Sequence, residues 1–263
     1  GFRAVMVPFC LVFVFYFLLK GLNRLANEKK FCPLCPLLAG LFFGLGFHTY
    51  ISFRVAPLIL LFVFVPFWLR SRKEGFQKMF FVLTILFFAA IMIAALPIGL
   101  YFLQNPQDFI GRASGVSVFS QANPFQALIL SFVGHLSMFN FVGDFNWRHN
   151  PAGFPELLWP VGLLFLVGLF VSVKRLIFSF HKDLSGFFVP GFLLALWSVM
   201  LLPGILTSEG IPHSLRTIGA IPGTFLLAGL GADTLLGKIW PIIKRRRGFN
   251  FGLLLAGLAL LAV

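Results

Sequence analysis

The sequence predicts an all-α protein: a polytopic transmembrane helical bundle with about eight spanning helices and one further interfacial helix. Three observations predict this class: an apolar composition, a series of apolar runs, and basic residues confined to alternate connections. Hydrophobic residues make up 59% of the 263 residues and charged residues only 11%, against roughly a quarter charged in soluble domains. The 37 phenylalanines exceed what one water-soluble core can bury, so a bilayer is the expected solvent.

The apolar runs give the expected spans in chain order. They cover about 4–19, 34–47, 55–69, 79–101, 157–173, 187–206, 217–236 and 249–263. Several are shorter than the roughly 20 residues that cross a bilayer. Aromatic residues at their edges suit the membrane interface and can extend them.

The connection over 102–156 is much the longest in the chain. Within it, the stretch of about 124–141 mixes Gln126, Ser131, His135 and Asn140 with apolar residues. This mixture favours an interfacial or re-entrant helix over a spanning one. Because long connections in a compact membrane protein are usually functional, we expect 102–156 to carry part of the site.

Basic residues predict which loops face which side of the membrane. Sixteen of the 21 lysines and arginines fall in four connections: Lys20, Arg24, Lys29 and Lys30; Arg70, Arg72, Lys73 and Lys78; Lys174, Arg175 and Lys182; Lys238, Lys244, Arg245, Arg246 and Arg247. The positive-inside rule is met only when all four lie in the cytoplasm and 124–141 does not cross. We therefore expect a multi-pass protein of the plasma (inner) membrane, with the loops 48–54, 102–156 and 207–216 external. The net charge of +13 then requires no nucleic-acid partner.

The cysteines indicate little chemistry of their own. Cys32 and Cys35 form a single CxxC pair after Lys29 and Lys30, at a predicted cytoplasmic helix entry where thiols stay reduced. A zinc site would call for a second pair or nearby histidines, so a structural role is favoured.

Both ends of the chain suggest a fragment. The sequence begins with Gly1 rather than Met, and no signal peptide precedes the first run. The last run stops after about 15 residues, short of a full span. We therefore expect 1–263 to be a single transmembrane domain cut from a longer polypeptide.

The first candidate constellation is HTYISFRVAP, residues 48–57, between two apolar runs. Tyr50 and Arg54 are four residues apart and would share a face of a helical turn. Arg54 could grip a lipid phosphate bidentately or extend to the headgroups as an anchor, and both readings stay open. Arg112, in the long external segment, is a further candidate for substrate or phosphate contacts.

The second constellation is GDFNWRHN, residues 143–150, followed by Pro151 and Pro155. Glycine and proline on either side indicate a defined loop. Asp144 could accept a proton, Arg148 could bind phosphate, and His149 could relay a proton or form a hydrogen bond. A structural ion pair between Asp144 and Arg148 is the alternative.

The third constellation is SEGIPHSLRTIGAIP, residues 208–222, where Glu209, His213 and Arg216 precede an apolar run. Backbone N–H groups and Arg216 at a helix start would favour an anion, and a simple hairpin and capping role is the alternative. No group of side chains has convincing metal-ligand spacing, so no metal ligands and no cofactor are assigned, and a requirement for a divalent metal stays open.

Four stretches together resemble a known family. In order they are GLGFHTYISFRVAP, RASGVSVFS, MFNFVGDFNWRHNPAGFP and EGIPHSLRTIGAIP, with helices between them. Over about 36–236 the chain resembles bacterial membrane glycosyltransferases of the dolichyl-phosphate-mannose–protein mannosyltransferase type (RgtA/B/C/D-like) in the GT-C superfamily. The resemblance implies the C-terminal part of a GT-C-like fold.

The resemblance also implies a reaction: transfer of a sugar, with inversion, from a polyprenyl-phosphate-linked donor to a glycan, lipid or protein acceptor on the external side. A carboxylate would act as general base, and basic residues would stabilise charge on the departing phosphate. The catalytic acidic motif of the family lies in a first external loop, and no acidic external residue precedes position 48 here. We therefore expect the main base to lie upstream, leaving the candidate residues above for substrate or phosphate contacts.

Other functions remain open on the sequence. An oligosaccharyltransferase or an O-antigen ligase or polymerase would use a related lipid-linked sugar. A transporter or flippase would bind the same lipid without chemistry, and should show inverted repeats and polar groups near the bilayer midplane. A non-catalytic scaffold fits the hydrophobicity but leaves the polar external residues unexplained.

Overall fold

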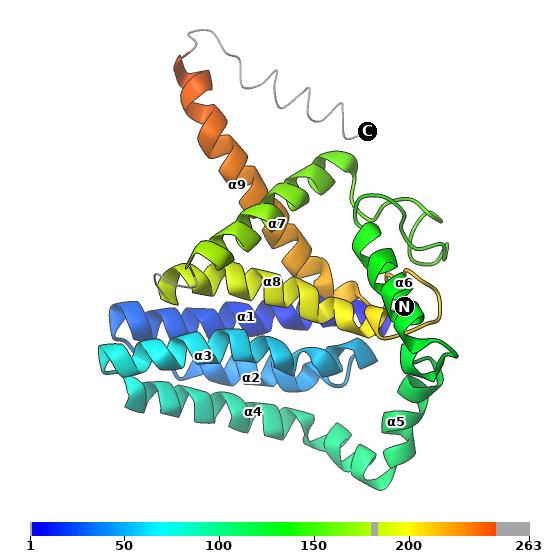
Figure 1. Ribbon diagram of the computed structural model, residues 1–263. Helices are drawn as coiled ribbons and strands as arrows, with labels where there is room; N and C mark the ends of the chain where they lie inside the picture. The colour runs from blue at the N-terminus through cyan, green and yellow to red at the C-terminus, as the bar shows by residue number, and fades with distance from the viewer. Residues whose placement is uncertain (1, 180–183, 246–263) are drawn as a thin grey trace.

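The computed structural model describes residues 2–179 and 184–245 of the chain (Figure 1). Within these residues the regular structure is helical, apart from one isolated antiparallel bridge between Ser117 and Thr207. Six helices are long and apolar enough to cross a membrane. They belong to α1 (Phe2–Glu28), α3 (Pro57–Glu74), α4 (Gln77–Gln104), α7 (Trp159–Ser179), α8 (Leu184–Ile205) and α9 (Ile221–Arg245). The all-α class and a multi-pass arrangement of apolar helices are thus confirmed.

Two predicted spans have a different outcome. The run at 34–47 forms α2 (Leu34–Gly46), and its 13 residues rise only about 20 Å, too short to cross a bilayer unaided. The run at 249–263 lies outside the described residues. The stretch predicted as an interfacial helix forms α6 (Pro124–Ser137), a short apolar helix that ends before 141.

One helix was not expected. α5 (Pro106–Gly115) follows α4 directly, and no long apolar run in its sequence predicts it. Its sequence nevertheless carries two ordinary start signals, Pro106 at the first helical position and Asp108 in the first turn. Three short 3-10 helices complete the elements: η1 (Ile51–Val55), η2 (Val118–Ser120) and η3 (Ile218–Ala220).

The long helices form a slab with a polar end. In Figure 1, α1, α2, α3, α4 and α8 run side by side, whereas α7 and α9 cross one another and diverge from the slab. α5, α6 and the connections around them gather at one end. The element contacts agree: α2 packs on α1 and α4, α8 packs on α3, α7 and α9, and α6 packs on α8.

Glycines allow two helix pairs to approach closely. On α2, a Cβ at Gly40 would collide with the carbonyl oxygen of Phe87 on α4, and one at Gly44 would lie 2.5 Å from the Cβ of Ala94. On the other pair, Gly168 of α7 and Gly231 of α9 lie against each other's backbone. Small residues four apart are typical of helix contacts in membranes, where close backbone packing replaces the hydrophobic effect as the driving force.

The outer surface of the slab is apolar. Ile93 and Leu103 on α4 are 75% and 80% exposed, and phenylalanines, leucines and valines on α1, α3 and α7 are exposed as well. In water, such a continuous apolar surface would drive aggregation. Hydrocarbon is the solvent that removes this cost, so the surface agrees with a membrane protein.

Two of the connections predicted to be cytoplasmic, those after α1 and α3, meet at one end of the slab. Lys29, after α1, lies 3.3 Å from Glu74 at the end of α3, and Arg70 donates to both Glu74 and Asn27. The Cys32–Cys35 pair lies at this end and is a disulfide, which corrects the expectation of reduced thiols. The cause is local: the first turn of α2 folds Cys35 back over Cys32, bringing the Cα atoms within 5.6 Å.

The connections predicted to be external meet at the opposite end. Val118 N–H donates to Leu206 O, and Ser208 N–H donates to Val116 O, so the segment before α6 pairs with the segment after α8. Arg54 reaches α5 and donates to the carbonyl oxygen of Phe109 at 2.7 Å. The three separate segments 48–54, 102–156 and 207–216 therefore build one polar assembly.

Candidate functional site

The centre of the polar assembly is the loop between α6 and α7. Glu156 N–H donates to Met138 O and Leu157 N–H to Phe139 O, so the end of the loop pairs with its beginning. Further along, Gly153 N–H donates to Asp144 O. A Cβ at Gly143 would collide with the carbonyl oxygen of Phe154, so only glycine permits this close approach. The paired arms give the loop a defined shape and fix the position of Asp144.

Asp144 is buried, with 4% of its surface exposed, and accepts hydrogen bonds on both carboxylate oxygens. Oδ1 accepts from Asn146 N–H at 2.8 Å. Oδ2 accepts from His149 Nδ1–H at 2.7 Å and from Ser214 N–H at 2.9 Å. The partner of Asp144 is therefore His149 and not Arg148, which corrects the Asp144–Arg148 pair considered from the sequence.

These hydrogen bonds keep Asp144 ionised. Burial alone would raise its pKa, but the donors Asn146 N–H, His149 and Ser214 N–H together outweigh burial, and the pKa lies below its ordinary value. The backbone N–H of Ser214 belongs to the 207–216 loop, where the sequence predicted an anion site. The anion that this loop binds in the structure is the carboxylate of Asp144.

Glu156 is the second carboxylate of the site, and its environment differs from that of Asp144. Its Oε1 accepts from the Ser214 hydroxyl and from Asp144 N–H, the latter at 3.4 Å. Burial raises the pKa of Glu156 above its ordinary value, and the hydrogen bonds offset only part of this effect. The two acids thus have pKa values displaced in opposite directions, an arrangement typical of acid–base sites.

His213 is held by a buried histidine behind it. His135 is fully buried, donates from Nδ1–H to Ser131 O at 2.7 Å, and accepts at Nε2 from His213 N–H at 3.1 Å. These two bonds define His135 as a neutral ring protonated at Nδ1. Through them α6 fixes the backbone of His213, and the ring of His213 then lies over His149 with 5.0 Å between the ring centroids.

The ring of His213 is partly buried beside Arg216 and Asp144. Burial and the nearby positive charge of Arg216 lower its pKa to about 4, so the ring is neutral at physiological pH. Its Nδ1 atom is buried without a hydrogen-bond partner among the described residues and lies 4.0 Å from Asp144 Oδ2. Buried polar atoms without a partner are rare in folded proteins and call for an explanation.

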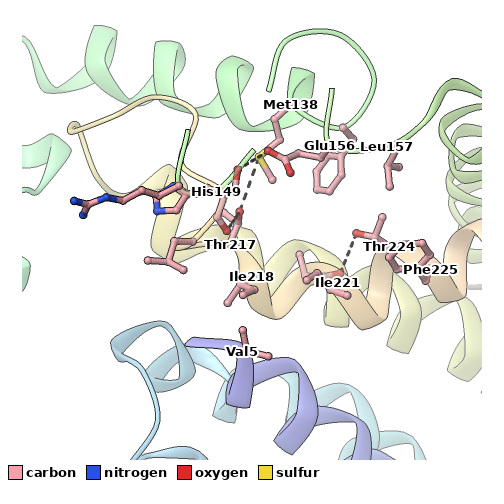
Figure 2. Close-up of a pocket in the computed structure, with 15 residues that line it drawn as sticks. Val5, Met138, His149, Glu156, Leu157, Thr217, Ile218, Ile221, Thr224 and Phe225 are labelled. Carbon is pink, nitrogen blue, oxygen red and sulfur yellow. Dashed lines mark hydrogen bonds between the residues drawn. The ribbon is translucent and has the colours of Figure 1, made fainter. Parts of the chain in front are cut away.

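A cavity of about 490 Å³ opens beside this cluster (Figure 2). One wall is apolar and comes from α1, η3 and α9, with Val5, Ile218, Ile221 and Phe225. The opposite wall comes from the loops. Its polar lining residues are Arg148, His149, Glu156, Ser214 and Thr217. The cavity is therefore amphiphilic, with apolar helices on one side and titratable groups on the other.

Arg148 and Arg216 have different surroundings. Arg148 lines the cavity, and no side-chain partner for its guanidinium is found within residues 2–179 and 184–245. Arg216 instead donates from Nη2 to Glu209 Oε2 at 2.8 Å, and from Nη1 to Glu209 O and Thr207 Oγ1. Arg216 therefore closes its own loop, in line with the hairpin role considered from the sequence, and Arg148 is the arginine that is free to bind a ligand.

The first constellation lies apart from the cluster. Arg54 stacks on the rings of Phe102 and Phe109 and bonds the latter's carbonyl oxygen, so it anchors α5 to η1. Tyr50 has an extended backbone before η1, so it does not share a helical face with Arg54 as expected. Arg112 lies within α5, and its side chain is outside the described part of the structure.

The structure adds residues that the sequence did not single out for the site. Glu156, Ser214, Asn146 and His135 all contact the cluster, through the bonds given above. It also brings Asp144, His149 and His213 into a group whose ligand atoms lie within 4.8 Å of one another. Because these residues come from two loops 64 or more positions apart, sequence spacing could not reveal the group.

No protein-family model, curated protein or solved structure matches this chain. Its class is therefore defined by its own geometry: a multi-pass helical membrane protein with a buried carboxylate–histidine cluster beside an amphiphilic cavity at one end of the helices.

Proposed function

We propose that this chain is part of a membrane glycosyltransferase that transfers a sugar from a polyprenyl-phosphate-linked donor to an acceptor. The observation that carries the proposal is the cavity, which combines an apolar helical wall with a polar loop wall. A polyprenyl-phosphate sugar has the same two parts, an apolar chain and a charged, hydroxyl-rich head. The resemblance of four ordered sequence stretches to the GT-C superfamily supports the same function.

Arg148 is the residue that would hold the donor phosphate. It is exposed on the cavity rim, and its side chain has no partner in the described structure. A guanidinium binds two phosphate oxygens with parallel hydrogen bonds, and its charge stabilises the phosphate as it departs. The isoprenoid chain would lie along Ile221 and Phe225 at the start of α9.

The resemblance implies a main base upstream of these residues; among the described residues, Glu156 is the carboxylate placed to accept the acceptor hydroxyl's proton. It lines the cavity, whereas Asp144 lies behind it in the hydrogen-bond cluster. Its raised pKa makes it a stronger base than an ordinary carboxylate. In the proposed reaction the hydroxyl oxygen bonds to the anomeric carbon, its proton passes to Glu156, and the polyprenyl phosphate leaves with the electrons of the broken C–O bond.

We also infer that the cavity end faces the exterior of the plasma membrane. The opposite end carries five basic residues, and such clusters are retained in the cytoplasm: Arg24, Lys29, Arg70, Arg72 and Lys73. The Cys32–Cys35 disulfide at the same end is a bond that cytoplasmic proteins rarely form, so the assignment rests on the basic residues. A membrane-impermeant maleimide should then label Trp147→Cys in intact cells and Lys73→Cys only after lysis. The reverse pattern would overturn the assignment of sides.

The donor is tested directly with the chain in native membranes. A photoreactive, radiolabelled polyprenyl-phosphate sugar should crosslink to the wild type, with excess unlabelled donor as competitor. Arg148→Ala should weaken crosslinking by tenfold or more, because a charge-assisted bond is worth roughly 1.5–3 kcal/mol. Arg72→Ala removes the same charge at the opposite end and should leave crosslinking unchanged.

The chemical step is tested by transfer of the labelled sugar to membrane acceptors. Glu156→Gln should retain donor crosslinking and lower transfer by about a hundredfold or more, as expected for loss of a proton acceptor. Equal crosslinking by Arg148→Ala and wild type would overturn the phosphate assignment. Donor that crosses the bilayer unchanged, without transfer, would indicate a transporter.

A further inference from the structure

We propose that Asp144, His149 and His213 bind a divalent transition-metal ion, with zinc as the expected ion. Asp144 and His149 come from the loop between α6 and α7, and His213 from the loop between α8 and η3. Their ligand atoms all lie within 4.8 Å of one another. The site stands on this geometry and holds whether or not the protein transfers a sugar.

The set of ligands is one that zinc prefers. Two imidazoles and a carboxylate leave a fourth tetrahedral position open, as in zinc sites that take water or substrate. Zinc–nitrogen bonds of about 2.0–2.1 Å place tetrahedral ligand atoms roughly 3.3 Å apart. The observed spacing includes 2.7 Å between His149 Nδ1 and Asp144 Oδ2 and 4.0 Å between His213 Nδ1 and the same oxygen. Modest rotations of the two rings therefore reach the required geometry.

The strongest single observation is the Nδ1 atom of His213. It is buried and has no hydrogen-bond partner in the described structure. The oxygen that faces it, Asp144 Oδ2, is too far for a hydrogen bond and already accepts from His149 and Ser214. A metal ion between this nitrogen and that oxygen would give both atoms a strong partner.

The surrounding groups hold the ligands as outer partners do in metal sites. Asn146 N–H and Ser214 N–H orient the Asp144 carboxylate. The buried His135 ring fixes the backbone of His213. Such outer hydrogen bonds set ligand orientation and contribute to affinity. Their presence distinguishes this group from three exposed side chains that meet by chance.

The proton balance of binding is simple. His213 ligates through the lone pair of Nδ1. His149 donates its Nδ1 proton to Asp144 without metal. To ligate through Nδ1, the ring carries its proton on Nε2 instead, which leaves the Nδ1 lone pair for the ion. His149 also lines the cavity, next to Arg148 and Glu156, so the proposed ion would lie beside the cavity.

The test is the metal content of the protein itself. The chain is purified in detergent without a polyhistidine tag, dialysed against metal-free buffer, and analysed by elemental mass spectrometry. We expect roughly one zinc ion per wild-type chain. His213→Gln and Asp144→Asn should reduce it at least tenfold, while His48→Gln, which changes a histidine outside the group, should retain it. Size-exclusion and helical circular dichroism establish that each variant is folded.

A second readout does not depend on the stability of the variants. Cobalt added to metal-depleted wild type should give the intense visible absorption of a tetrahedral ion, and zinc should remove it. If the purified protein contained iron instead of zinc, the proposed site would stand and only the identity of the ion would change. Wild type with no bound metal and no cobalt spectrum, or with the same metal content as His213→Gln, would overturn the site.

Discussion

The two ends of the helical slab both hold carboxylates among basic groups, yet they hold them differently. At the basic end Glu74 accepts from Arg70 at 2.6 Å and from Lys29 at 3.3 Å, and its side chain is 36% exposed. At the cavity end the Asp144 side chain is 5% exposed and is bound by two backbone N–H groups and a histidine. The first carboxylate is solvated by water and long flexible cations, and the second by fixed protein dipoles.

The difference shows which end holds its carboxylate in a fixed geometry. Exposed ion pairs on flexible side chains contribute little free energy and tolerate substitution. A buried carboxylate must be matched by fixed donors, because an unmatched one costs several kcal/mol. Fixed donors also hold charges in a defined geometry before a ligand arrives, as binding and catalytic sites require. The cavity end has such a fixed arrangement of donors, and the basic end does not.

Asp144→Ala should have the largest effect on stability. The substitution leaves Asn146 N–H, Ser214 N–H and His149 without their acceptor. We expect a loss of roughly 2–4 kcal/mol in the free energy of unfolding. The measurement is unfolding by SDS titration in mixed micelles, followed by tryptophan fluorescence. Asp144→Asn keeps one acceptor oxygen and should lose less. A loss below about 1 kcal/mol for the alanine variant would mean that the cluster is not a stabilising centre.

Arg216→Ala should have an intermediate effect. Its guanidinium side chain is 14% exposed and donates to Thr207 and to both the backbone and side chain of Glu209. We expect a loss of about 1–2 kcal/mol and faster proteolytic cleavage within 207–216, because the loop loses its central donor. Glu209→Ala is the matched control, since that carboxylate is exposed and the other two acceptors of Arg216 remain. Equal cleavage rates in wild type and Arg216→Ala would contradict the closing role.

The helices were largely predictable because apolar runs report them directly. The runs at 79–101 and 187–206 became α4 and α8 with boundaries shifted by a few residues. The run at 34–47 became α2, a helix of only 13 residues, and its glycines Gly40 and Gly44 pack it against α4. α5 was missed because its ten residues contain no long apolar run.

The candidate site was predictable as a set of segments but not as a set of contacts. The sequence pointed to Asp144, Arg148, His149 and His213, and the structure places all four in or beside one cluster. The sequence could not show that Arg216 would pair with Glu209, because the same loop sequence is compatible with an arginine that binds a ligand and with one that closes the loop. Nor could it show that the backbone of 207–216 would bind the carboxylate of Asp144 from another loop. Such pairings depend on long-range packing, which local patterns do not contain.

Glu74→Ala should have the smallest effect, although it removes two ion pairs at once. Both partners are long side chains, and Lys29 is 56% exposed. Solvent screens the pairs, and ordering the side chains costs entropy, so we expect a loss of about 1 kcal/mol or less. Raising the ionic strength from 0.05 to about 0.5 M should shrink even this difference, because the Debye length then falls well below 10 Å. The same titration should leave the cost of Asp144→Ala nearly unchanged, since its donors are two backbone N–H groups and a histidine around a buried carboxylate. If salt reduced both costs equally, the two ends would not differ in the way their carboxylates are held.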